Sequence, residues 1–129
     1  MTYSKIFQGD DIIDMLSLDM YDRGAQFGGE LDNALGFVTR EAITRKKLTA
    51  LSETGGRRGM QDWWSSVLLP VVSKYPVGYV LTWRHSYRPR FSRMGNPKQP
   101  FPDDFKNFYN SPGSLFLKEV REANVYKRK

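Results

Sequence analysis

Apolar side chains gather in three short runs along the chain, each bounded by polar or turn-forming residues. The runs cover residues 12–18, 48–51 and 77–83. They are nearly continuous instead of alternating, which is typical of strands covered on both faces of a parallel sheet. We therefore predict three buried strands.

The segment between the first two runs has the apolar spacing of a helix. One face carries apolar residues at i, i+4, i+7 and i+11, namely Leu31, Leu35, Val38 and Ala42. Glu30 stands near the start and Arg45 near the end, an arrangement that suits the helix dipole. The pattern predicts a long helix that buries this face.

A second helix is predicted over residues 60–74, after the second run. Its apolar side consists of Met60, Trp64, Val67, Leu68 and Val71. Pro70 inside it predicts a kink or an early end. Tryptophans at 63 and 64 are expected to pack in the core and at its rim.

Two shorter helices are predicted near the end of the chain, after a polar loop over residues 84–100. They cover residues 102–109 and 112–123. The second is predicted to begin at Ser111-Pro112, a capping residue followed by proline at the first helical position.

The order of elements is strand, helix, strand, helix, strand, helix. Strands joined through helices run parallel to one another. Three parallel strands leave two open sheet edges, so the architecture is α/β but incomplete as it stands. We expect self-association or partial disorder of the chain by itself, and the open edges indicate that it is part of something larger.

Composition limits the classes of function. The 129 residues are one domain at most and are 40% hydrophobic. The chain has no cysteine and a single histidine, His85, so thiolate and multi-histidine metal sites are excluded. No metal or cofactor is expected. The sequence contains neither a run of apolar residues long enough to span a membrane nor a signal-peptide pattern at Met1. The net charge of +6 permits an acidic partner.

Chemically useful side chains follow each predicted strand. The first run leads into Asp19-Met20-Tyr21, the second into Ser52-Glu53-Thr54-Gly55, and the third into Trp83-Arg84-His85. Because the carboxyl ends of parallel strands meet at one rim, these side chains are predicted to lie together. A carboxylate beside an aromatic platform and polar donors suits a sugar site.

Five phrases in this order carry a resemblance to a known family. They are DMLSLDMYD, LTALSETG, WWSSVLLP, GYVLTWRHS and PDDFKNFYNSPGSLFLKEV. Together they resemble the C-terminal part of glycoside hydrolase family 26, whose members are mostly β-mannanases on a (β/α)8 TIM barrel. The resemblance runs from about Tyr3 to Val125 and implies that residues 1–129 are the last three βα units, strands six to eight, of a catalytic domain.

The resemblance also implies a site and a substrate. Glu53 would be the nucleophile of a retaining endo-β-1,4-mannanase, and Tyr21 would hydrogen-bond beside it. Trp83 would form a platform under the sugar, and Arg84 would reach a neighbouring sugar. The implied substrate is β-mannan or a related polysaccharide, and the full-length enzyme is expected to be secreted or exposed at the cell surface.

Three departures from the family qualify this reading. His85 stands where the family usually has asparagine, and the loop 90–97 lacks the family's aromatic and proline-rich phrase. The family's acid/base is a glutamate preceded by histidine at the end of strand four, and nothing in this chain matches that motif. Asp19 and Asp22 are carboxylates near the rim without the motif. The isolated chain is therefore expected to be inactive on mannan.

Two other interpretations stay open. Arginines interleaved with Tyr87 and Phe91 over Arg84–Arg93 resemble a nucleic-acid-binding patch of a small basic protein. A solvated loop is the favoured reading of that stretch, so no nucleic-acid partner is expected. The chain could also be an inactive remnant of a hydrolase.

Overall fold

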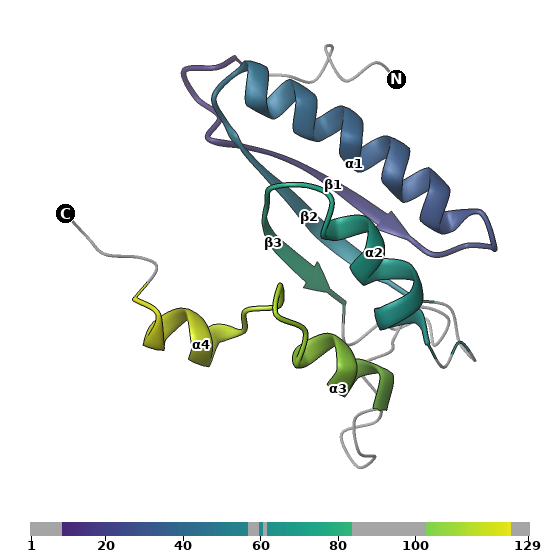
Figure 1. The fold of residues 1–129 in the computed structure, drawn as a ribbon. Helices are drawn as coiled ribbons and strands as arrows, with labels where there is room; N and C mark the ends of the chain where they lie inside the picture. Colours follow the sequence, from purple (N-terminus) through teal and green to yellow (C-terminus); the bar gives the residue numbers. More distant parts are fainter. Residues whose placement is uncertain (1–8, 57–59, 61, 84–102, 125–129) are drawn as a thin grey trace.

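Three parallel strands form one sheet in the computed structural model, which describes residues 9–56, 60, 62–83 and 103–124 (Figure 1). The strands are β1 (Met15–Tyr21), β2 (Leu48–Gly55) and β3 (Val77–Thr82), in the order β1-β2-β3. Both neighbouring pairs are parallel, so the carboxyl ends of all three strands lie at the same end of the sheet, the rim. The predicted α/β class with a parallel sheet is confirmed.

The first strand begins later than predicted, at Met15 instead of residue 12. Gly9 has a φ of 115°, a left-handed conformation that favours glycine, and residues 9–12 form a turn. The Ile12 N–H donates to the Gly9 carbonyl at 3.4 Å, and the Ile12 side chain is 67% exposed. The turn therefore uses residues that the apolar run alone assigned to a strand.

The long helix between β1 and β2 is confirmed as α1 (Phe27–Thr44). All members of its predicted apolar face are buried: Leu31, Leu35, Val38 and Ala42. At its C-terminal end Lys46 has a φ of 56°, which turns the chain towards β2. The helix packs on β1 and β2 through this face.

The second predicted helix is shorter than 60–74 and consists of two parts. A π-helical turn, η2 (Trp64–Leu68), continues as α2 (Leu69–Val72). The Leu69 N–H bonds to the Trp64 carbonyl, five residues back. Pro70 has no N–H and would crowd the carbonyl four residues earlier, so a widened turn before it is sterically reasonable. The helix ends at Val72, two residues after Pro70, as predicted from the proline.

Two short helices follow, α3 (Asp103–Tyr109) and α4 (Leu117–Glu122). The prediction that the last helix starts at Pro112 is wrong. Residues 111–114 form a turn instead, in which the Ser114 N–H donates to the Ser111 carbonyl at 2.9 Å and Pro112 takes the position that proline favours in such turns. Helix α4 starts after Phe116, whose N–H donates to Glu119 Oε2 at 3.2 Å.

The hydrophobic core lies between one layer of helices and one face of the sheet. Its main cluster joins α1, β2, the η2–α2 segment and α3 through Phe27, Leu31, Leu35, Leu51, Trp63, Trp64, Leu68, Val71 and Phe105. Trp64 meets Phe105 edge to face at 4.9 Å between ring centroids, and Trp63 lies 6.3 Å from Phe27. Both tryptophans are therefore core residues, as predicted.

A buried carboxylate ties α3 to the start of the η2–α2 segment. Asp104 is 7% exposed and accepts hydrogen bonds from the Trp64 N–H at 2.7 Å and the Ser65 N–H at 3.0 Å. It also accepts a hydrogen bond from the Ser65 hydroxyl. The first N–H groups of a helix have no partner within the helix, so a carboxylate from α3 supplies one.

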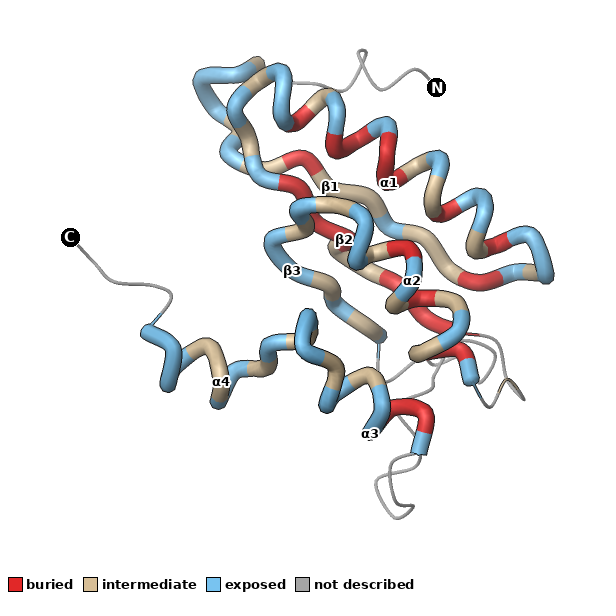
Figure 2. The backbone as a smooth tube through the Cα atoms, viewed as in Figure 1, coloured by how far each residue is buried: buried red, intermediate tan, exposed pale blue. Residues whose placement is uncertain are grey.

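Strand β3 differs from the prediction of burial on both faces. Figure 2 shows β2 largely buried, whereas β3 alternates between intermediate and exposed positions. Tyr79 and Leu81 are 45% and 43% exposed. They alternate with Val80, which packs against the core, so the helices of the described residues cover one face of β3. Within the described ranges, no helix is long and apolar enough to cross a membrane.

Candidate active site

The carboxyl ends of β1 and β2 bring two predicted site residues into contact. Tyr21 is the last residue of β1, and Glu53 lies near the end of β2. The Tyr21 hydroxyl donates a hydrogen bond of 2.5 Å to Glu53 Oε2. The chain therefore holds a phenol against a carboxylate at the rim where parallel α/β folds place their sites.

Glu53 lies on the sheet face opposite to the helices. Leu51 is fully buried in the helix-side core, and its partner on β1 is Leu18. The next pair joins Glu53 to Asp19, which is exposed. Paired residues of neighbouring strands share a face, so Asp19 and Glu53 stand together on the uncovered side.

The environment of Tyr21 keeps its phenol protonated. Burial raises its pKa first, the hydrogen bond to Glu53 and the charges of Glu53 and Asp19 add to this, and the pKa reaches about 12. Ionising the phenol would place a second negative charge beside a carboxylate. At neutral pH Tyr21 is thus a hydrogen-bond donor to Glu53.

This raised pKa predicts a pH dependence of stability. The unfolded chain loses the Tyr21 proton near the ordinary pKa of 10.0 and the folded chain near 12. The stabilisation is therefore fully present below pH 10 and is lost between pH 10 and about pH 12. Tyr21→Phe should abolish this component, so the difference in free energy of unfolding between wild type and variant should shrink across that interval.

Urea unfolding at a series of pH values measures that difference. Tyr79→Phe, on the same face of the sheet, controls for the loss of a hydroxyl group as such. If the difference in free energy of unfolding between wild type and Tyr21→Phe stays constant up to about pH 12, the environment assigned to Tyr21 is wrong.

Trp83 follows β3 directly and reaches the same rim. Its N–H donates to the Thr54 carbonyl at 2.9 Å, and its side chain is 42% exposed. Alternation from Tyr79 and Leu81 places the indole on the face that carries Glu53. Gly55 pairs with Tyr21 and puts no side chain between Tyr21 and Trp83. Arg84 and the loop to Arg93, predicted to contact sugar or nucleic acid, lie outside the described residues.

The two aspartates considered near the rim have different surroundings. Asp19 is exposed beside Glu53. Asp22 is 1% exposed, and its Oδ1 accepts a hydrogen bond from the Gly24 N–H at 3.0 Å, closing a turn after β1. Asp22 is therefore a turn residue within the fold.

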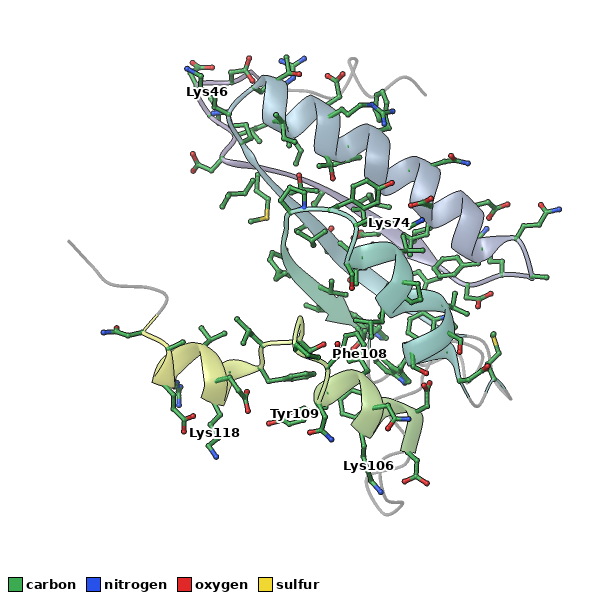
Figure 3. The ribbon with its side chains drawn as sticks, viewed as in Figure 1. Lys46, Lys74, Lys106, Phe108, Tyr109 and Lys118 are labelled. Carbon is green, nitrogen blue, oxygen red and sulfur yellow. The ribbon has the colours of Figure 1, made fainter. Side chains whose placement is uncertain are left out.

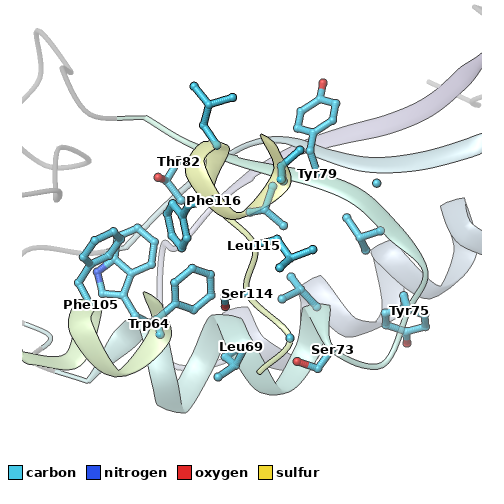
Figure 4. A pocket seen from close by; sticks show the side chains of 18 residues that line it. Trp64, Leu69, Ser73, Tyr75, Tyr79, Thr82, Phe105, Ser114, Leu115 and Phe116 are labelled. Carbon is cyan, nitrogen blue, oxygen red and sulfur yellow. The ribbon is translucent and has the colours of Figure 1, made fainter. Parts of the chain in front are cut away.

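A cavity of about 590 Å³ lies elsewhere, between α2, β3 and the α3–α4 segment (Figure 4). Its lining includes Trp64, Val80 and Phe116, and the described residues that line it include no charged side chain. Val80 pairs with Leu51 on the helix side of the sheet, so the cavity is on the opposite face from Glu53. Its polar groups include the hydroxyls of Ser73 and Ser114, and the rim carboxylate is not part of its lining.

The lysines labelled in Figure 3 lie on the surface, away from the sheet rim. Lys74 pairs with Asp32 at 2.9 Å and Lys106 with Asp103 at 2.7 Å. Such exposed pairs add little to stability. In the part of the chain that the structure describes, no group of three or more His, Cys, Asp or Glu residues is arranged to hold a metal ion.

Solved structures match this fold closely, although neither a scan of protein-family models nor a search of curated proteins gives a match. A glycoside hydrolase family 26 β-mannanase from Bacteroides ovatus is 38% identical over 90% of this chain and 35% of its own, with a TM-score of 0.75. The chain has the fold of part of a family 26 barrel.

Two further family 26 structures agree. The catalytic domain of an endo-β-1,4-mannanase from Bacillus sp. JAMB-750 is 26% identical over 96% of this chain and 38% of its own, with a TM-score of 0.76. A modular endo-β-1,4-mannanase from Cellulomonas fimi is 26% identical over 92% and 29%, with a TM-score of 0.72.

These comparisons confirm the resemblance to family 26 and the reading of the fold as an incomplete TIM barrel. The chain spans about a third of the length of the family 26 structures that it matches. The assignment to strands six to eight and the roles of Glu53, Tyr21, Trp83 and Arg84 stay predictions.

Proposed function

We propose that this chain carries the nucleophile of a retaining β-mannan hydrolase and that Glu53 is that nucleophile. The observation that supports this most is the contact between Tyr21 and Glu53 on the uncovered strand-end face of a family 26 fold. The substrate class follows from the structural relatives, which are β-mannanases.

In this mechanism a Glu53 carboxylate oxygen attacks the anomeric carbon of the sugar. A bond forms between that oxygen and the anomeric carbon while the glycosidic C–O bond breaks, and the leaving oxygen takes a proton from a second carboxyl group. Water then releases the sugar from Glu53, with the second group acting as base.

Tyr21 and Trp83 would act on either side of this step. The Tyr21 phenol stays protonated, so it can hold one oxygen of Glu53 and leave the other free for attack. The half-exposed Trp83 indole offers an apolar face to a pyranose ring. Arg84 would contact the next sugar.

The isolated chain is expected to leave mannan intact, because a sugar alkoxide is a poor leaving group without an acid to protonate it. In retaining glycoside hydrolases the two catalytic carboxyl groups lie about 5–5.5 Å apart on opposite sides of the scissile bond. In the proposed enzyme, further barrel units supply the second group and cover the exposed side chains of β3.

The first half of the reaction can be tested on this chain by itself. In a 2-deoxy-2-fluoro-β-mannosyl fluoride, the fluoride at C1 is a leaving group that needs no acid. The fluorine at C2 slows breakdown of the covalent intermediate. We expect a covalent adduct on the peptide that contains Glu53, measured by mass spectrometry after proteolysis. Adduct formation on other carboxylates, or none at millimolar reagent, would refute the proposal.

A further inference from the structure

Close to Glu53, β2 contains one residue more than the facing stretches of β1 and β3. On the β1 side, Leu51 pairs with Leu18 and Glu53 with Asp19, which leaves Ser52 extra. On the β3 side, Leu51 pairs with Val80 and Thr54 with Thr82, so β2 again has one extra residue. Two independent pairings thus place a β-bulge at Ser52-Glu53.

The bulge decides which way Glu53 points. In a regular strand side chains alternate, so residues 51 and 53 would share a face. Leu51 is fully buried among α1 and the η2–α2 segment, and a regular strand would drive the Glu53 carboxylate into that apolar core. The inserted residue reverses the alternation, and Thr54 returns to the buried side with 0% exposure.

Ser52 also forms a hydrogen bond to β1 at the point where the register shifts. Its hydroxyl donates to the Leu18 carbonyl across the strands at 3.1 Å. Leu18 is the last residue on β1 before the register shifts. This bond exists only where the extra residue places the Ser52 hydroxyl against β1, so it favours the bulged register over a regular one.

We infer that Ser52 is a positioning residue for Glu53: its hydroxyl bond to the Leu18 carbonyl holds the bulge that turns the carboxylate out of the core and against Tyr21. The inference rests on the proposed function for its catalytic meaning. The geometric part, the contact between Tyr21 and Glu53, can be measured without any substrate.

The matched test is Ser52→Thr against Ser52→Val, which have the same shape and differ in the hydroxyl group. Ser52→Ala is a third variant without a β-branch. Labelling of Glu53 by the 2-fluoro mannosyl fluoride should be near the wild-type rate in Ser52→Thr. In Ser52→Val and Ser52→Ala it should be at least about tenfold slower, because small displacements of reacting groups have large effects on rate.

The second readout is the titration of Tyr21, followed by NMR of ring-labelled tyrosine. Its pKa of about 12 should persist in Ser52→Thr and move towards 10.0 in Ser52→Val and Ser52→Ala, since contact with Glu53 is one cause of the shift. Wild-type labelling and titration in Ser52→Val would overturn the inference. So would global unfolding of Ser52→Val with Ser52→Thr folded, because Ser52 would then support the strand as a whole.

The two readouts separate the two proposals. If wild type forms no adduct but Tyr21 titrates as expected in the variants, the proposed function fails and the positioning role stands. If wild type is labelled and the variants match it in both readouts, the positioning role fails and the function stands.

Discussion

Glu53→Gln should abolish the covalent adduct formed with the 2-fluoro mannosyl fluoride. Glutamine keeps the shape of the side chain and can still accept the Tyr21 hydrogen bond, but its neutral amide is a very poor nucleophile. Loss of an enzyme nucleophile lowers rates by up to about a millionfold in well-studied cases, so we expect labelling at least about a thousandfold slower. Intact-mass spectrometry over a time course measures this directly.

The chain offers a matched control for that experiment in a second tyrosine–glutamate pair. The Tyr109 hydroxyl donates to Glu119 Oε1 at 2.7 Å on the exposed surface of α3 and α4. Glu119→Gln removes a carboxylate with a similar partner but without the strand-end setting, and labelling should proceed at the wild-type rate. An adduct that survives Glu53→Gln and disappears in Glu119→Gln would refute the assignment of the nucleophile.

Glu53→Gln also has a consequence that needs no reagent. The hydrogen bond and the charge of Glu53 both raise the pKa of Tyr21, after burial as the main cause. Without that negative charge the pKa of Tyr21 should fall below about 12. A pKa that falls but stays above 10.0 would show that Tyr21 is still buried and that the charge at position 53 has been removed.

The rim could be predicted from the sequence because it depends on few physical rules. Buried strands joined by helices run parallel, so residues that follow the strands must share one edge. That rule alone brings Tyr21, Glu53 and Trp83 to one end of the sheet. The face on which Glu53 stands could not be predicted in the same way. The apolar pattern of β2 does not reveal an inserted residue, and a one-residue slip reverses every side chain after it.

Two other differences have the same kind of origin. Ser111-Pro112 is compatible with both a helix start and a turn, because proline favours the first position of each. In the structure Ser111-Pro112 forms a turn, Phe116 packs against the core, and α4 begins after Phe116. The runs at β2 and β3 are similarly apolar, yet among the strands of the described residues only β2 has a neighbouring strand on each side. Burial of β3 depends on strands and helices beyond its own sequence pattern.

The largest effect on stability should come from Asp104, which the sequence places only as an acidic residue near a helix start. Asp104→Ala removes a buried acceptor from two backbone N–H groups and the Ser65 hydroxyl. Those N–H groups would stay enclosed without a partner, and each such group costs about 1–3 kcal/mol. We expect the free energy of unfolding to fall by about 3 kcal/mol, measured by urea denaturation.

Asp103 is the natural control, because it is adjacent and has the same chemistry in a different place. Its side chain is 92% exposed and pairs with Lys106 of the same helix, so Asp103→Ala should change the free energy of unfolding far less than Asp104→Ala. Asp104→Asn keeps one acceptor oxygen and should lie between the two alanine variants. Equal effects at 103 and 104 would mean that α3 is held by its aromatic contacts alone. A large effect at 104 alone would instead show that one carboxylate joins α3 to the helix layer, and so holds the sheet whose other face carries Glu53.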